Sequence, residues 1–145
     1  MNEIELLKEA VEARNASYSP YSNYAVGAAI RCTNGEIIHG CNVENSSYPN
    51  GSCAETIAFN KAVSDGKWAF DSIAIVGAST NLKSIDEAGD ICFPCGLCRQ
   101  VIREFVNPAT FIVIVAPLNN LMNFKTFTLE ELLPNSFGPE ALEVK

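Results

Sequence analysis

Three cysteines and one glutamate form the most informative pattern in this sequence. The tripeptide Cys53-Ala54-Glu55 is followed about forty positions later by Pro94-Cys95-Gly96-Leu97-Cys98. A structural zinc site is usually closed by four protein ligands, whereas a catalytic site keeps one coordination position for water, which the metal acidifies. Three thiolates beside a carboxyl group that need not bind the metal therefore indicate hydrolytic chemistry, in which Glu55 would carry protons.

The spacing of the cysteines suits two helix starts that face each other. Cys95 and Cys98 are one helical turn apart, so both sulfurs can point at one ion. Cys53 precedes a second helical pattern, and the exposed amides at a helix start favour a thiolate. Two alternatives give the neighbouring glutamate no purpose: a closed four-cysteine site that adds Cys41 or Cys92, and cysteines that bind no metal.

Length and composition bound the kind of protein. A chain of 145 residues with 48% hydrophobic residues can bury a sizeable core, and we expect one domain over residues 1–145. The formal charge of -7 and a pI near 4.6 argue against the basic surface of a nucleic-acid binder, so no nucleic-acid partner is expected. A small uncharged or cationic ligand fits better, although an acidic surface is equally a common route to solubility.

The chain ends and the apolar runs indicate the compartment. Residues 2–9 are charged and contain no apolar signal core, and the longest apolar stretch, 109–118, is too short to cross a bilayer. We therefore expect a cytoplasmic protein with no membrane role. In a reducing compartment the six cysteines are expected to be thiols or metal ligands, not disulfides.

The elements that must position the cysteines alternate between helical and strand patterns. An Asn34-Gly35 dipeptide, well suited to a tight hairpin turn, separates two of the strands. The pattern predicts helices at 2–17, 52–64, 94–105 and 129–133, and strands at 24–32, 36–44, 71–78, 111–116 and 123–127. Buried strands separated by helices indicate parallel pairing with helical crossovers. The predicted fold class is α/β, a three-layer α/β/α sandwich with a central mixed sheet of about five strands.

Two polar residues stand at the end of the second predicted strand. Because strand side chains alternate, Asn42 and Glu44 are predicted to share one face, next to the loop that carries Cys53. A polar strand end that simply faces water is the alternative. His39, the one histidine, falls on the opposite face and is left out of the site.

At this point the chain resembles the cytidine deaminase family, specifically its small homotetrameric type with three cysteine ligands. The signature of zinc deaminases includes a glutamate that does not bind the metal. The matching segments cover nearly the whole chain: 24–29, 40–48, 53–55, 94–100 and 130–134 with Phe137. The resemblance implies a zinc-dependent enzyme that converts cytidine and 2′-deoxycytidine to uridine and 2′-deoxyuridine with release of ammonia. It also implies a small nucleoside as substrate and a homotetramer.

The resemblance assigns a role to each matching position. The metal ligands would be Cys53, Cys95 and Cys98, and Glu55 would shuttle protons to ring N3 and to the departing amine. The substrate-binding residues would be Tyr24, Asn42, Glu44, Ala54, Phe93 through its backbone carbonyl, and Phe137 from a neighbouring subunit. Hairpin register places Tyr24 on the face opposite Glu44, so this assignment requires a bulge or bend.

The chain departs from the family pattern directly after the glutamate. The family usually has an arginine there, where it offsets the negative charge of three thiolates around a divalent metal, whereas this chain has Thr56. Arg99 is a candidate for the missing positive charge, and a surface or subunit-interface charge is the equal alternative. The stretch 79–93 is also longer and more polar than the compact family connection.

These departures keep two other functions open. Deaminases of modified or aminoacylated cytosine nucleosides, of the blasticidin-S-deaminase type, share the metal chemistry, and some lack the arginine. A catalytically inactive, zinc-stabilised nucleoside-binding module is a third hypothesis, against which the intact Glu55 argues.

Overall fold

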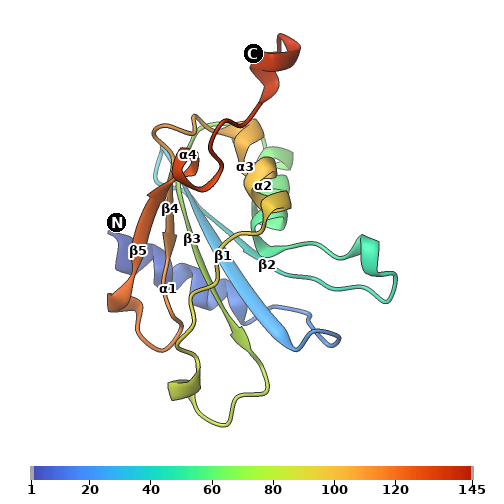
Figure 1. The fold of residues 1–145 in the computed structure, drawn as a ribbon, viewed down its shortest axis with the longest axis vertical. Coiled ribbons are helices and arrows are strands. Elements are labelled where there is room, and N and C mark those ends of the chain that lie inside the picture. The colour runs from blue at the N-terminus through green and yellow to red at the C-terminus, as the bar shows by residue number, and fades with distance from the viewer. Residues whose placement is uncertain (1, 145) are drawn as a thin grey trace.

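The computed structural model describes residues 2–144 as a five-stranded sheet with helices on both faces (Figure 1). The strand order is β2-β1-β3-β4-β5. β3 and β4 are parallel, and the other three pairs are antiparallel. The strands are β1 (Tyr24–Cys32), β2 (Ile37–Cys41), β3 (Phe70–Ser79), β4 (Ile112–Val115) and β5 (Lys125–Thr128). This mixed sheet confirms the predicted fold class.

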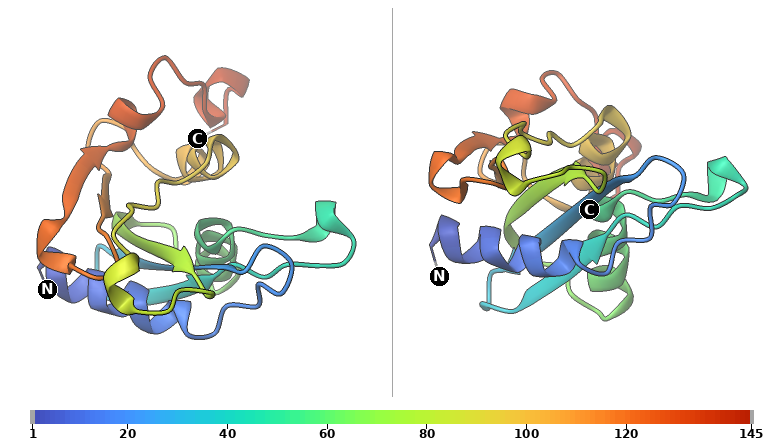
Figure 2. Two further views of the ribbon diagram at one scale, coloured as in Figure 1. Left: turned by 60° about the horizontal axis from the view of Figure 1, so that its bottom comes forward. Right: turned by 90° about the horizontal axis from the view of Figure 1, so that it is seen from below.

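One face of the sheet is covered by helix α1 (Glu3–Arg14) (Figure 2). A capping box formed by Asn2 and Glu5 starts the helix by satisfying its first free amides. Gly27 of β1 permits the helix to approach closely, because a Cβ there would lie 2.0 Å from the carbonyl oxygen of Ala10. The apolar side chains of α1 complete a core on this side of the sheet.

The opposite face carries α2 (Ala54–Ser64) and α3 (Gly96–Phe105). Phe59 of α2 is fully buried at the centre of this second core and contacts three other aromatic rings, those of Phe70, Phe105 and Phe111. The buried rings hold both helices against the sheet. The start of each helix lies close to the start of the other, since the cysteines at these two ends form one cluster.

The hairpin forms as expected, but its second strand is shorter than predicted. Gly35 has φ +92°, the left-handed conformation that the turn requires. β2 ends at Cys41 and not at residue 44, because Asn42 replaces regular pairing with side-chain bonds. Its Oδ1 accepts from the backbone N–H of Val26, and its own backbone N–H donates to the Val26 carbonyl. The chain therefore bends just where the predicted substrate residues lie.

The last part of the chain leaves the sheet. Helix α4 (Leu129–Leu132) starts with a capping box of Thr128 and Glu131. The following residues, 134–144, here called the C-terminal arm, project away from the body and end in a short 3-10 turn, Pro139–Leu142 (Figure 1). None of the helices in the described part of the chain is long and apolar enough to cross a membrane.

Candidate metal centre and active site

Two cysteines occupy the same position in two helices. Cys53 is the N-cap of α2 and Cys95 is the N-cap of α3, so both helices start later than the predicted 52 and 94. An N-cap side chain usually accepts a hydrogen bond from its own helix, but neither cysteine does so. Both sulfurs are therefore free to face a common ion at two positive helix ends.

The three predicted ligands form one cluster. The Sγ atoms of Cys53, Cys95 and Cys98 all lie within 4.8 Å of one another, and those of Cys95 and Cys98 are 3.6 Å apart. Tetrahedral zinc with Zn–S bonds of about 2.3 Å separates its sulfurs by roughly 3.8 Å, so this donor set fits zinc. In residues 2–144, Cys41, Cys92 and His39 do not belong to the cluster, which removes the support for a four-cysteine site.

Two of the three sulfurs, those of Cys53 and Cys98, ionise unequally. Hydrogen bonding from Cys98, and less strongly from Cys95, lowers the pKa of Cys53 to about 6. The same bond, together with burial, raises the pKa of Cys98, because that thiol must keep its proton to donate it. Cys53 therefore forms a thiolate before Cys98 does, and metal binding would release the proton that Cys98 retains.

Glu55 stands beside the cluster without joining it. Its side chain is in the first turn of α2 and only 4% exposed. Burial, reinforced by the charge of Cys53, raises the pKa of Glu55 to about 7, while a hydrogen bond with Cys98 acts in the opposite direction. A carboxyl group that titrates near neutrality can both accept and return a proton.

A glycine on the neighbouring strand fixes the start of α2. A Cβ at Gly40 of β2 would lie 2.3 Å from the carbonyl oxygen of Ala54 and 2.7 Å from the backbone nitrogen of Ala58. The helix therefore rests directly on the backbone of β2. This close approach fixes Ala54 and Glu55 relative to the sheet.

Neither Thr56 nor Arg99, the two residues considered for offsetting the thiolate charge, bonds strongly to a sulfur. The Thr56 hydroxyl lies 3.8 Å from Cys98 Sγ, which allows only a weak hydrogen bond. Arg99 donates instead to the carbonyl oxygens of Pro94, at 2.7 Å, and Leu132, at 2.6 Å. Arg99 thus ties the segment 94–98, which carries two of the cysteines, to α4. Among the described residues it forms no hydrogen bond to a sulfur.

Asn42 and Glu44 both bond to the segment that leads into β1. The Asn42 amide accepts from Ser17 and Val26 and donates to the Tyr24 carbonyl at 2.8 Å. Glu44 accepts two backbone N–H bonds, from Tyr21 at 2.9 Å and from the following serine, and the hydroxyl of that serine as well.

Glu44 also borders an open hollow. The hydrogen bonds from Ser22 and Tyr21 lower the pKa of Glu44, so its carboxylate is ionised at neutral pH. The hollow has a volume of about 340 Å³ and is lined by Tyr21, Ser22, Glu44, Asn45, Tyr48 and Gly51. It is large enough for a sugar-sized group.

Ser22 also links the backbone of Tyr24 to Glu44. Its hydroxyl donates to Glu44 and accepts from the Tyr24 backbone N–H at 3.0 Å, so the bend brings these residues together despite the unfavourable register. The Tyr24 ring packs over Gly77 of β3, beside Cys92.

Cys92, which the sequence offered only as a fourth ligand of a closed metal site, instead lies beside Tyr24. Burial raises the pKa of Tyr24 to about 12 and that of Cys92 to about 11, and the two groups share a hydrogen bond. Cys92 also interacts electrostatically with Glu55. A Cβ at Gly77 would lie 2.9 Å from Cys92 Cβ, and this missing side chain is the signal that could have indicated a tight contact.

The two predicted phenylalanines lie in different surroundings. The Phe93 ring packs on the Phe127 ring, with ring centroids 5.7 Å apart. The backbone carbonyl of Phe93 immediately precedes the segment 94–98 in the chain. Phe137 lies on the C-terminal arm with 65% of its surface exposed. Within one chain, therefore, its ring is left largely without a packing partner.

Comparison with known proteins defines the class to which this fold and site belong. A family model described as "Cytidine and deoxycytidylate deaminase zinc-binding region" matches residues 1–114. The chain therefore belongs to the cytidine and deoxycytidylate deaminase family, as the sequence resemblance predicted.

Individual relatives cover nearly the whole chain. It is 43% identical over 138 residues to the cytidine deaminase of Sporosarcina psychrophila, covering 94% of this chain and 92% of that protein. The crystal structure of cytidine deaminase from Burkholderia pseudomallei matches with a TM-score of 0.80 and 36% identity, covering 94% of this chain and 100% of that one. The blasticidin-S deaminase of Bacillus cereus is 36% identical over 132 residues, covering 91% and 89%.

Proposed function

We propose that this protein is a zinc-dependent cytidine deaminase that hydrolyses cytidine and 2′-deoxycytidine to the uridine nucleosides and ammonia. The observation that carries the proposal is the cluster of three sulfurs within 4.8 Å of one another beside a buried glutamate. Cys53, Cys95 and Cys98 would hold Zn²⁺, which supplies an acidified water when bound. The names of the relatives at 43% and 36% identity support the same activity.

Glu55 would perform the proton transfers of the reaction. Cytosine C4 is a weak electrophile, so ring N3 must be protonated for water to add, and the amino group must be protonated before it leaves. A carboxyl group with a pKa near 7 can accept the proton lost by water and deliver it to N3. It can then take the proton of the new C4 hydroxyl and pass it to the amine, so that the C–N bond breaks, ammonia leaves and C4 becomes a carbonyl. Its burial excludes bulk water from these steps.

The remaining site residues would orient the nucleoside. Asn42 keeps one amide hydrogen, and the Glu44 carboxylate faces the hollow, so the pair can donate to and accept from a ribose hydroxyl. A site built to pair a hydroxyl rejects ligands that lack it. The backbone of Ala54 and the Phe93 carbonyl would bind the base, and the Tyr24 ring would pack against it.

The decisive experiment measures ammonia release from cytidine, 2′-deoxycytidine and modified cytosine nucleosides, with zinc content determined on the same sample. We expect about one zinc per chain and turnover of the first two substrates. Zinc without turnover across the panel would instead support a nucleoside-binding module.

A modified cytosine nucleoside is the second candidate substrate. Two observations favour it: Thr56 gives only a weak bond to Cys98, and the chain is 36% identical to a blasticidin-S deaminase. Relative rates on cytidine and on blasticidin S separate the two functions. Negligible turnover of cytidine with rapid turnover of blasticidin S would reverse the preference.

We further propose a cytoplasmic homotetramer in which Phe137 enters a site of a neighbouring copy. Its exposed ring supports this assembly. Co-expression of Glu55→Ala and Phe137→Ala copies provides the test, because a hybrid contains sites with an intact Glu55 and a neighbour's Phe137. Activity above that of either variant alone is the expected result, and an absence of complementation would contradict the assembly.

A further inference from the structure

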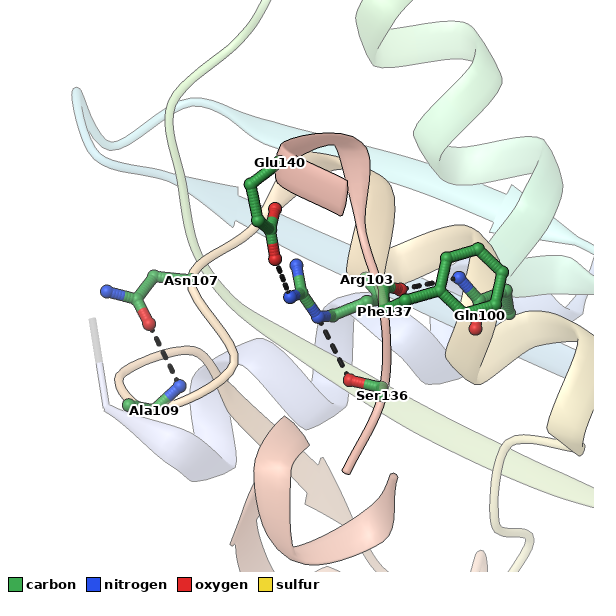
Figure 3. A network of polar contacts seen from close by, with 7 residues as sticks. All are labelled: Gln100, Arg103, Asn107, Ala109, Ser136, Phe137 and Glu140. Atoms are coloured by element: carbon green, nitrogen blue, oxygen red, sulfur yellow. Dashed lines mark hydrogen bonds and ion pairs between the residues drawn. The ribbon is translucent and has the colours of Figure 1, made fainter. Parts of the chain in front are cut away.

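The C-terminal arm is attached to α3 by a cluster of polar contacts (Figure 3). Arg103 Nε donates to the Ser136 hydroxyl at 3.0 Å, and its Nη2 donates to the Glu140 carboxylate. One turn earlier on α3, the Gln100 amide donates to the Phe137 carbonyl at 3.0 Å. Phe137 is therefore held by α3 through its own carbonyl, and it lies in the sequence between Ser136 and Glu140, which both bind Arg103.

Arg103 is unusual because its guanidinium is buried, with the residue 8% exposed. A buried charge is costly unless it is paired, and removing one partner leaves that charge uncompensated. Its side-chain partners, Ser136 and Glu140, both belong to the arm. The pairing also lowers the pKa of Glu140, so the carboxylate is ionised at neutral pH.

The arm is shaped to receive this side chain. A Cβ at Gly138 would lie 2.2 Å from Arg103 Nη1 and 2.6 Å from Cζ, so the guanidinium packs directly on the arm's backbone. Gly138 has φ -140°, an extended conformation open to any residue, and its missing side chain therefore serves the contact and not the backbone.

The arm presents apolar groups that residues 2–144 leave uncovered. Phe137, Leu142 and Val144 are all exposed. A second copy of the chain is the partner that fits, because its hollow beside Glu44 is bordered by the exposed rings of Tyr21 and Tyr48. Aromatic side chains seated in such hollows are typical anchors of protein interfaces.

We propose that Arg103 is a positioning residue, which holds the arm through Ser136 and Glu140 so that Phe137 is presented in a fixed direction to a second copy. Since α3 also supplies Cys98 and is preceded by Cys95, one helix then fixes a chain's own metal ligands and the ring it contributes to its neighbour. This inference rests on the homotetramer proposed above.

The main test neutralises the exposed end of the ion pair with Glu140→Gln. The matched control is Asp71→Asn, which neutralises the carboxylate of another surface pair, Arg31 Nε to Asp71 Oδ2 at 2.9 Å, between β1 and β3. We expect Glu140→Gln to raise the KM for cytidine about three- to ten-fold with kcat within two-fold, and Asp71→Asn to leave both unchanged.

A second variant tests the contact without changing charge. Gly138→Ala places a methyl group against the guanidinium and should raise KM in the same way. In the Phe137→Ala background, neither Glu140→Gln nor Gly138→Ala should raise KM further, because the ring they direct is already absent. Such non-additivity is a result that a merely structural role would not give.

The outcomes separate this inference from the assembly on which it rests. If Phe137→Ala raises KM but Glu140→Gln and Gly138→Ala behave like Asp71→Asn, the role of Arg103 is refuted and the assembly stands. If Phe137→Ala leaves KM unchanged and light scattering gives the 15.7 kDa mass of one chain for the active enzyme, both are refuted.

Discussion

The N-terminal ends of α2 and α3 begin alike and face different surroundings. Each is capped by a metal-ligating cysteine in extended backbone. The residue two positions after Cys53 is Glu55, 4% exposed, whereas the residue two positions after Cys95 is Leu97, 71% exposed. The start of α2 thus carries a buried carboxyl group, whereas the start of α3 carries one exposed cysteine, Cys95, and one buried cysteine, Cys98.

The packing around the two helix starts also differs, and it is tighter at α2 than at α3. Gly40 lies in close contact with the first turn of α2, whereas a Cβ added at Gly96 in α3 would meet nothing within 4 Å. The residue proposed to carry protons, Glu55, therefore lies on the more tightly packed helix start. Four substitutions or conditions can break or sharpen this contrast.

The largest expected effect comes from replacing the side chains that lie two positions after each capping cysteine, Glu55 and Leu97. Glu55→Ala should keep zinc but lose roughly 100- to 10,000-fold in kcat, the contribution of one general acid/base, or about 3 to 5 kcal/mol of barrier. Leu97→Ala, its counterpart after Cys95, should leave kcat within about two-fold. Steady-state kinetics with zinc analysis measures both, and near-normal turnover by the glutamate variant would remove its proposed role.

The second effect is on the pH dependence of stability in the metal-free protein. The pKa of Glu55 rises from 4.5 to about 7 on folding, so folding disfavours the charged form. The contribution of this group to stability should be greatest below pH 4.5 and fall by about 3 kcal/mol as the pH rises to about 7. Urea unfolding of the wild type and Glu55→Gln isolates the effect, since their difference should change only within that window.

The comparison of the wild type with Glu55→Gln is necessary because Cys53 also titrates differently in the folded chain. Its pKa is lowered on folding to about 6, so its thiolate adds stability as pH rises from there toward 9, the opposite direction. Apart from the repulsion between the Cys53 and Glu55 charges, this contribution is common to the wild type and Glu55→Gln and cancels in the difference. A difference that does not vary with pH would show that the Glu55 carboxyl is not disfavoured by burial.

A third, smaller effect should appear at the two glycines. Gly40→Ala must push α2 away from β2 and should cost about 1 to 3 kcal/mol or more, with reduced zinc content. Gly96→Ala occupies open space and should gain up to about 1 kcal/mol, because glycine is a poor helix former. Chemical denaturation of the zinc-loaded proteins ranks them, and equal stability would refute the proposed difference in packing.

The smallest effect is expected at Thr56. Thr56→Val keeps the shape of the side chain and removes the hydroxyl that lies 3.8 Å from Cys98 Sγ. Because this bond is long, kcat should fall by less than about three-fold. A loss of more than about thirty-fold would assign the hydroxyl a principal role in balancing the thiolate charge.

The sequence was sufficient for the centre of the site. Cys53, Cys95 and Cys98 meet as their spacing predicted, because helical periodicity and helix-start electrostatics are local properties. The mixed sheet was likewise predicted from the alternation of elements. The two-residue error at each helix start arose because sequence does not distinguish a cysteine in a helix from one that caps it.

The residues that the sequence missed depend on contacts between distant segments. The glycine at 77 is compatible with a tight contact, but nothing local indicates that Cys92 and Tyr24 are its neighbours. Likewise, nothing in α3 indicates that Arg103 faces the arm. The end of β2 was misplaced for a similar reason, since Asn42 looks like a strand residue until its amide reaches Val26. Long-range side-chain bonds overrode the local pattern in each case.

The shared position of Cys53 and Cys95 has a consequence for unfolding. An ion held at both helix caps would cross-link the chain across residues 54–94, a stretch that contains all of α2 and β3. Because a metal that binds the folded chain better than the unfolded one shifts the folding equilibrium, the melting temperature should follow the free zinc concentration. The supply of zinc to the protein would then determine how long the folded chain persists, as well as whether it is active.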